Sequence, residues 1–180
     1  SPANETIPGP GGLGPSPVRT SVHGDVLHTR PLLVNYGAAG IIAFFGANDG
    51  TLRAVQAGQP EHGGGRELWA FIAPETFAKF KRLRDASPAL QWPSPSSGIA
   101  PAAPALATGS PKDYFFDGPV THHAVRDAAG NIVRAYLFAS ARRGGSFLYA
   151  FDVTAPAAPR FLWKHAARDG ADSAFDDLAQ

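Results

Sequence analysis

The chain has 180 residues, with 16 basic and 15 acidic side chains and a formal net charge of +1. This length suits a single domain with a sizeable hydrophobic core. The balanced charge provides none of the basic surface that binds nucleic acid or anionic membranes. Cysteine is absent, which excludes disulfides, thiolate metal ligands and a cysteine nucleophile.

The longest apolar stretch, residues 37–47, is too short to cross a bilayer as a helix, which takes about 20 residues. Methionine is also absent and no signal-peptide pattern opens the sequence, so we expect a segment of a longer parent chain. The 20 glycines and 17 prolines, together with 44% hydrophobic residues, indicate many short strands joined by turns.

The first half of the sequence predicts an arm followed by four strands. Residues 1–17 contain five prolines and four glycines, and we expect a flexible Pro/Gly-rich arm. Strands are predicted over residues 31–36, 41–45, 51–57 and 66–72. The uninterrupted apolar run at 41–45 is typical of a strand that is covered on both faces. Asn48-Asp49-Gly50 predicts a tight hairpin turn, because these residues tolerate a positive φ.

One helix is predicted over residues 74–84. Pro74 opens it, Glu75 lies in the first turn, and basic residues fill the last turn, as the helix dipole favours. Phe77, Phe80 and Leu83 recur at three-residue intervals and would form one buried face. Residues 86–111 contain six prolines, and we expect an irregular insertion there.

The second half predicts five further strands and a polar tail. The strands are expected at residues 114–117, 119–125, 132–140, 146–152 and 160–165. A turn at 127–131 and the pair Gly144-Gly145 separate them. Residues 168–180 form the tail.

The two halves repeat one pattern: an apolar strand, a glycine turn, a second strand, a polar loop and a strand with Leu-Trp. Trp69 follows Gly50 by 19 residues, and Trp163 follows Gly145 by 18. A four-stranded unit repeated in this way is typical of a β-propeller blade. We therefore predict an all-β fold, a partial propeller of two to three four-stranded antiparallel blades with one short helical insertion, over residues 18–167.

The tryptophans and the acidic residues have structural interpretations. A Leu-Trp pair at equal places in two repeats is typical of packing between blades rather than of ligand binding. Asn48-Asp49-Gly50 lacks the alternating oxygen ligands and closing carboxylate of a calcium loop, so we interpret it as a turn. Asp169, Asp172, Asp176 and Asp177 are interpreted as a solvated tail rather than a metal site.

No motif indicates an enzyme. His122 and His123 are adjacent on a predicted strand, so they point to opposite faces and cannot share one metal ion. Nucleophile-elbow, Walker and Rossmann patterns are absent, and no carboxylates form a recognisable acid–base pair. Arg142-Arg143 at a hairpin tip is interpreted as a solvated turn rather than an anion contact. We expect no catalytic, cofactor-binding or metal-binding residue in this chain.

Taken together, the repeats resemble the β-propeller domain of the PilC/PilY family of type IV pilus tip-associated adhesins. The runs that carry the resemblance are FGANDGTLRAV at 45–55, GRELWAFIAPE at 65–75, YFFDGPVT at 114–121 and AFDVTAPAAP at 150–159. The run at 24–31 is similar to the family's entry into its first blade. The first of these runs is shared by quinoprotein-like propellers in general, whereas the helix after Ala-Phe-Ile and the Tyr-Phe-Phe-Asp-Gly run are specific.

The resemblance implies a non-enzymatic role in pilus assembly, surface attachment and twitching motility. It implies an exported protein of a Gram-negative bacterium, at the pilus tip or outer surface, with minor pilins as partners. Some family members bind calcium through an Asp/Asn-rich loop in a later part of the propeller. This chain has no such loop, so we expect calcium, if any, in the parent protein outside this segment and no cofactor within it.

Two other functions are open to a chain with this repeat. A quinone-cofactor dehydrogenase uses similar repeats, but it needs a stacking tryptophan, calcium ligands and a catalytic aspartate, and the sequence does not place such a set. An outer-membrane assembly scaffold is similar in its repeats but lacks the helix and the proline-rich insertion.

Two or three blades form only an arc, so we expect the chain alone to be poorly soluble or self-associating through exposed strand edges.

Overall fold

The computed structural model describes residues 5–8, 15–18, 24–59, 61, 63–85, 87–88 and 110–166. The chain divides into two compact units. One unit consists of Gly24–Thr76 and Tyr114–Gln180 and contains both large sheets, and the other consists of Ser1–His23 and Phe77–Asp113.

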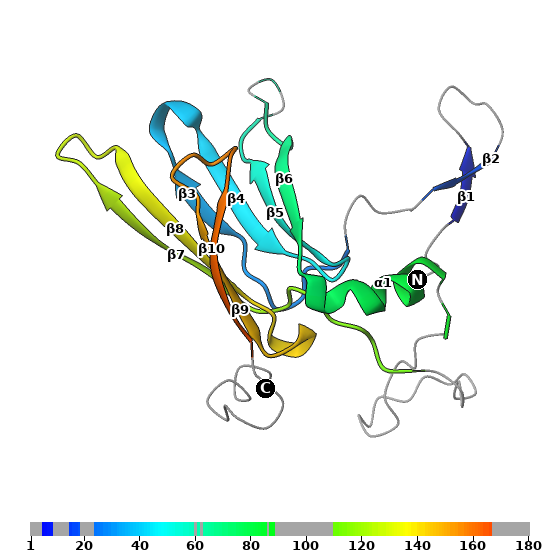
Figure 1. The fold of residues 1–180 in the computed structure, drawn as a ribbon. Coiled ribbons are helices and arrows are strands. Elements are labelled where there is room, and N and C mark those ends of the chain that lie inside the picture. The colour runs from blue at the N-terminus through cyan, green and yellow to red at the C-terminus, as the bar shows by residue number, and fades with distance from the viewer. Residues whose placement is uncertain are drawn as a thin grey trace, which may run out of the picture. The chain divides into compact units, whose positions relative to one another are not determined.

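The larger unit contains two four-stranded antiparallel sheets (Figure 1). The first sheet has the order β3-β4-β5-β6, formed by Leu32–Asn35, Ile41–Gly46, Thr51–Gln56 and Glu67–Ile72. The second has the order β10-β9-β8-β7, formed by Val120–Arg126 (β7), Ile132–Ser140 (β8), Phe147–Asp152 (β9) and Arg160–Ala166 (β10). In each sheet every strand pairs with its neighbour in sequence, which is the strand order of a propeller blade and confirms the predicted fold class.

The two sheets repeat each other down to a β-bulge. In the first sheet Ala54 pairs with Trp69 and Val55 with Glu67, so Leu68 is skipped. In the second sheet Ala150 pairs with Trp163 and Phe151 with Phe161, so Leu162 is skipped. The Leu-Trp pair of the sequence therefore consists of a bulged leucine and the tryptophan that follows it, at the same place in both sheets.

The aromatic neighbours of the two tryptophans also match. The ring centroids of Phe44 and Trp69 lie 5.9 Å apart at 44°, and those of Phe138 and Trp163 lie 6.0 Å apart at 40°. Phe44 on β4 and Phe138 on β8 therefore have equivalent positions. The two sheets therefore repeat each other in three-dimensional structure as well as in sequence.

Alternation along the strands decides which side chains enter the core. Ile42, Phe44, Leu52 and Ala54 of the first sheet are fully buried, whereas Ile41 is 43% exposed. The register of β5 is thereby settled, with Leu52 and Ala54 facing inwards. The apolar run of β4 predicts a strand covered on both faces, but among the described residues only one face of β4 is well covered.

The inward face of the first sheet packs against the second sheet. Phe71 of β6 lies with its ring centroid 5.1 Å from that of Tyr149 and 5.0 Å from that of Phe151. Trp69 lies 6.3 Å from Phe151, and its indole N–H donates a hydrogen bond of 2.8 Å to the carbonyl of Pro156. For Trp69, the prediction that it packs one blade against the next is confirmed.

Trp163 differs from Trp69 in its surroundings. Its side chain is 38% exposed, and its ring neighbours are Phe138 and His165, both in its own sheet. Within the described residues, Trp163 therefore packs against no further sheet.

The predicted strand at 114–117 is wrong. None of these residues is in a strand; Phe115 and Phe116 form a bend and are fully buried. Their backbone groups bond to side chains from elsewhere, since the Phe115 N–H donates to the Asn48 side chain and the Phe116 carbonyl accepts from the Thr29 hydroxyl. The segment thus fills the core instead of joining a β-ladder, and we call residues 114–118 the connecting loop.

Two glycines allow this loop to approach other backbone segments closely. A Cβ atom on Gly46 would lie 2.2 Å from the Phe116 carbonyl oxygen, and one on Gly144 would lie 1.6 Å from that of Phe115. Real Cβ atoms do not approach so closely. Gly46 is in β4, and Gly144 ends the short 3₁₀ helix η6 (Arg142–Gly144).

The predicted helix is present as the 3₁₀ turn η4 (Pro74–Thr76) followed by α1 (Phe77–Asp85). No side chain of α1 is buried, and Phe77 is 59% exposed, so the expected buried face does not form within the described residues. Arg82 instead joins the ends of the predicted insertion. Its guanidinium pairs with Asp113 at 3.0 Å and donates to the carbonyls of Pro88, Ser110 and Pro111.

Of three predicted segments, two are described only in part and one, the tail, lies wholly outside the described residues. Within the segment expected to be an arm, β1 (Glu5–Pro8) and β2 (Pro15–Val18) pair as a two-stranded antiparallel sheet. Most of the insertion at 86–111 and the whole tail at 168–180 lie outside the described residues. The division into arm, propeller segment and tail therefore stays a prediction.

Candidate functional site

A cluster of polar side chains, of which Thr29, Asn48, Asp49 and Asp117 are buried and Asp25 and His28 are exposed, joins the two sheets, and we call it the junction cluster. It lies where the lead-in to the first sheet, the β4–β5 turn and the connecting loop meet. Its members are Asp25, His28, Thr29, Asn48, Asp49 and Asp117.

Asp117 is the most deeply buried member of the junction cluster. Its side chain has no exposed surface, and its carboxylate accepts hydrogen bonds from His28 Nδ1 at 2.7 Å and from Asn48 Nδ2 at 3.1 Å. A carboxylate removed from water needs such partners, because an unpaired buried charge is strongly destabilising. Asp117 is on the connecting loop, whereas His28 and Asn48 belong to the first sheet's side, so these bonds tie the two sheets together.

Asn48 is the centre of the junction cluster. Its amide nitrogen also donates to Asp25 Oδ2 at 3.2 Å, and its amide oxygen accepts the Phe115 N–H at 3.1 Å. One side chain thus joins the first sheet's lead-in, its own turn and the connecting loop. Thr29 adds to this, because its hydroxyl lies 2.9 Å from the carbonyls of both Phe116 and Gly118.

Asp49 holds the β4–β5 turn in place. Its carboxylate accepts bonds from the Thr51 hydroxyl at 2.6 Å, the Gly24 N–H at 2.9 Å and the Arg53 guanidinium at 2.7 Å. Burial alone would raise the pKa of Asp49, but these bonds outweigh it and hold the pKa below its ordinary value of 3.8. The turn residue Gly50 has φ +100°, which confirms the predicted role of glycine there.

The lowered pKa of Asp49 predicts a pH dependence of stability. A carboxyl whose folded-state pKa is depressed stabilises the fold above its unfolded pKa, and this contribution is lost as the pH falls through the folded value. We expect Asp49→Asn to reduce the loss of unfolding free energy between about pH 5 and about pH 2. Urea denaturation across this range measures the effect, with the exposed Glu61→Gln as the matched control. An unchanged acid dependence in Asp49→Asn would contradict the assignment.

Two tyrosines make further connections in the larger unit. Tyr36 follows β3, and its hydroxyl donates a hydrogen bond of 2.8 Å to the carbonyl of Val153, which follows β9. Burial, together with the nearby charge of Asp152, raises the pKa of Tyr36 to about 12, so it stays a neutral donor at physiological pH. The Tyr149 hydroxyl donates to Glu75 at 2.6 Å.

Glu75 fixes the 3₁₀ turn η4 to the second sheet. Besides the Tyr149 hydroxyl it accepts a bond from the Lys164 ammonium on β10. Burial would raise the pKa of Glu75, but the bonds from Lys164 and Tyr149 outweigh it and lower that pKa. The sequence suggested only a helix-dipole role for Glu75, because its partners are 74 and 89 residues away.

The other residues considered in the sequence remain apart from this cluster. His122 and His123 are exposed on β7. Arg143 lies with its guanidinium carbon 5.5 Å from the Tyr114 ring centroid, and its neighbour Arg142 has φ +50°. The four aspartates of the tail lie outside the described residues.

The chemistry of the junction cluster is that of a connector. Asp25, Asn48, Asp49 and Asp117 all have carboxylate or amide atoms in the hydrogen bonds given above. Among the described residues, no three His, Asp or Glu side chains are placed to hold a metal ion. Nor does any helix in the described part of the chain have the length and apolarity to cross a membrane. The hydrogen bonds of the junction cluster fix the first sheet against the second.

Sequence reasoning identified Asn48-Asp49-Gly50 as a turn but missed the junction cluster. The turn is present, yet Asn48 and Asp49 are only 4% and 5% exposed. The available signal was the presence of Asn48, Asp49 and Asp117 within two largely apolar runs, at 45–55 and 114–121. Their pairing depends on contacts about 70 residues apart in sequence, which local patterns do not specify.

The sequence matches a curated protein named as a type IV pilus biogenesis factor. The chain is 26% identical over 176 residues to "Type IV pilus biogenesis factor PilY1 homolog" of Xylella fastidiosa, with 84% of this chain covered. This match confirms the resemblance of the repeats to the PilC/PilY family.

The match to the PilY1 homologue extends over only part of that protein. The chain spans 12% of the length of the Xylella protein. A crystal structure of the Pseudomonas aeruginosa PilY1 C-terminal domain aligns with a TM-score of 0.40 and 24% identity, covering 71% of this chain and 19% of that one. No family model matches the sequence.

Proposed function

We propose that this chain is a non-enzymatic propeller segment of a PilY1-like protein that acts in type IV pilus assembly, surface attachment and twitching motility. The observation that carries the proposal is the match to the pilus biogenesis factor over 84% of the chain. The two blade-type sheets support it, because they agree with the fold that the family resemblance implies.

The side chains also support a binding and assembly role. The charged residues of the junction cluster are occupied in holding sheets together, and the aromatic residues between the sheets form a packed core. A quinone-binding enzyme needs a tryptophan that is free to stack on the cofactor, whereas Trp69 packs against Phe44 and Phe151 and donates to the carbonyl of Pro156. This arrangement favours pilus assembly over the dehydrogenase alternative.

The proposal includes a location and partners. The protein is exported and acts at the pilus tip or cell surface of a Gram-negative bacterium, in contact with minor pilins. The segment itself needs no cofactor, and calcium, if used, binds elsewhere in the parent protein.

The proposal is tested in a type IV-piliated bacterium that carries the gene. We expect deletion of the codons for residues 24–166 to reduce the amount of sheared surface pili and the diameter of twitching zones. The exposed substitution His123→Ala is the matched control and should leave both unchanged, provided that immunoblots show equal protein levels. Normal piliation and motility in the deletion strain would overturn the proposal.

Two binding measurements separate the alternatives. We expect the purified chain to retain minor pilins in a pull-down, and saturable binding of the pyrroloquinoline quinone cofactor in a titration would instead favour the dehydrogenase. Retention of outer-membrane assembly proteins, without minor pilins, would favour the scaffold.

A further inference from the structure

The helix α1 is too short and too exposed to be stable by itself. It has nine residues, none of which is buried. Isolated helices of fewer than about 12 residues are marginal in water, and most helices in proteins are stabilised by packing of an apolar face. Phe77 is 59% exposed, and among the described residues the hydrophobic core of the sheets includes none from 77–113. Contacts other than this core therefore stabilise α1.

The Arg82 side chain connects α1 to both ends of the predicted insertion. We call these ends, Pro88 and residues 110–113, the neck. The guanidinium donates to the carbonyls of Pro88 at 3.1 Å, Ser110 at 2.9 Å and Pro111 at 2.6 Å, and it pairs with the Asp113 carboxylate at 3.0 Å. Only 17% of the Arg82 side chain is exposed, and hydrogen bonds from a charged group are stronger than neutral ones. One side chain thus holds the helix and both sides of the neck together.

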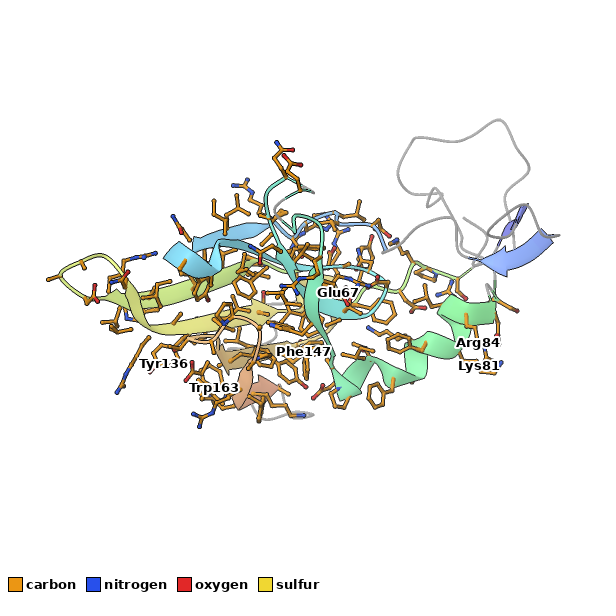
Figure 2. All side chains as sticks on the ribbon, turned by 90° about the horizontal axis from the view of Figure 1, so that it is seen from above. Glu67, Lys81, Arg84, Tyr136, Phe147 and Trp163 are labelled. Atoms are coloured by element: carbon orange, nitrogen blue, oxygen red, sulfur yellow. The ribbon has the colours of Figure 1, made fainter. Side chains whose placement is uncertain are left out.

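Two other cations of α1 have local partners instead. Lys81 pairs with Asp85 at 2.8 Å, and Arg84 pairs with the same carboxylate at 2.7 Å. The side chains of Lys81 and Arg84, labelled in Figure 2, are 80% and 74% exposed. Ion pairs this exposed contribute little, because water screens them. Arg82 is therefore the strongest connection between α1 and the neck.

The chain is fixed independently on both sides of this region. Before α1, Glu75 accepts bonds from Tyr149 and Lys164 of the second sheet. After the neck, Phe115 and Phe116 of the connecting loop are fully buried. These contacts do not involve Arg82, so separation of α1 from the neck would release neither sheet. The division of the chain into compact units also separates residues 77–113 from the sheets.

We propose that α1 and the neck form one local unfolding unit, which opens as a whole while both sheets stay folded, and that Arg82 couples the helix to the neck. When the Arg82 bonds break, the helix loses its strongest contact and the two sides of the neck lose their common donor. The ends of the insertion can then separate and rejoin without any change in the sheets. Segments that open in this way lie at the low-stability end of a protein.

Two measurements on the full chain report the two halves of this unit. Hydrogen exchange of the α1 amides reports opening of the helix. Trypsin cleavage after Lys112 reports opening of the neck, and the sequence has no other lysine or arginine between Arg84 and Lys112. We expect both rates to depend weakly on urea, because local opening exposes little surface. Exchange in β4 and β8 should depend steeply on urea, since it requires global unfolding.

Arg82→Gln is the variant that breaks the coupling contact. Glutamine has nearly the helix propensity of arginine but cannot reach the four acceptors. We expect α1 exchange and cleavage after Lys112 to accelerate by the same factor, about 10-fold or more, with exchange in β4 and β8 unchanged. Arg84→Gln is the matched control, because it makes the same change at an exposed position of the same helix. It should alter both rates by less than about two-fold.

Ala78→Gly tests the coupling from the side of the helix. It weakens α1 without changing a side chain that bonds to the neck, and glycine is a much poorer helix former than alanine. We expect cleavage after Lys112 to become about five-fold faster. Unchanged cleavage after Lys112 in either Arg82→Gln or Ala78→Gly would overturn the proposal. So would an equal acceleration of exchange in β4 and β8, which would show that the segment opens only with the sheets.

Discussion

Replacing Trp69 with alanine is expected to lower the free energy of unfolding by about 3 to 5 kcal/mol, whereas the same change at Trp163 should cost less than about 1 kcal/mol. Each of the two tryptophans follows a bulged leucine, and each lies about equally far from a phenylalanine ring at the equivalent position. Only Trp69 is also packed against the other sheet and bonded to Pro156. The difference between the two costs therefore measures the contribution of packing between sheets.

Urea denaturation followed by circular dichroism is the appropriate measurement, because removing a tryptophan changes the fluorescence signal. Measurements at two protein concentrations show whether association of the chain contributes to the apparent stability. Trp69→Phe is a useful intermediate, since it retains much of the aromatic packing and loses the hydrogen bond to Pro156. Equal costs for Trp69→Ala and Trp163→Ala would show that the contact between sheets contributes little.

The second large effect is expected at Asp117, whose replacement with alanine should cost about 3 kcal/mol. The substitution leaves one N–H of the buried Asn48 amide without its acceptor and removes the partner of His28 Nδ1, whose side chain is 33% exposed. Because native domains have only about 5 to 15 kcal/mol of net stability, a loss of this size removes a large part of it. Denaturation midpoints near pH 7 give the comparison.

A double substitution shows whether Asn48 and Asp117 stabilise the fold together or independently of each other. If Asn48 and Asp117 act together, Asn48→Ala/Asp117→Ala should cost less than the sum of the single changes, because removing both leaves fewer unpaired groups. Asp117→Asn is the matched control; it retains an oxygen that can accept from Asn48 and should cost less than Asp117→Ala. Additive costs would contradict the junction cluster as a connected unit.

The two experiments examine different parts of the same junction. Trp69 and Phe71 supply apolar packing over the middle of the sheets, and Asp117 with Asn48 supplies hydrogen bonds at the ends of the strands. In a PilY1-like protein these contacts would determine whether neighbouring blades move as one body. Loss of piliation in Asp117→Ala, at an unchanged protein level, would link the junction cluster to pilus function.

Local sequence patterns determined the strands and the repeat. The apolar run of β4, the turn at Asn48-Asp49-Gly50 and the Leu-Trp pairs were sufficient to place the strands of both sheets, because alternation and turn chemistry act over a few residues. The same logic failed at 114–117, where Phe115 and Phe116 have the composition of a strand. Their backbone groups are bonded by Asn48 and Thr29, and that competition comes from residues about 70 to 90 positions away.

The tertiary structure alone decided how the repeats differ. Trp69 and Trp163 are the same in the sequence pattern, and only packing shows that one is covered by a neighbouring sheet while the other is exposed. The junction cluster likewise arises from three segments that are separate in the chain. Burial and hydrogen-bond pairing depend on which segments fold against each other, so the pattern of a single segment determines its secondary structure and not its partners.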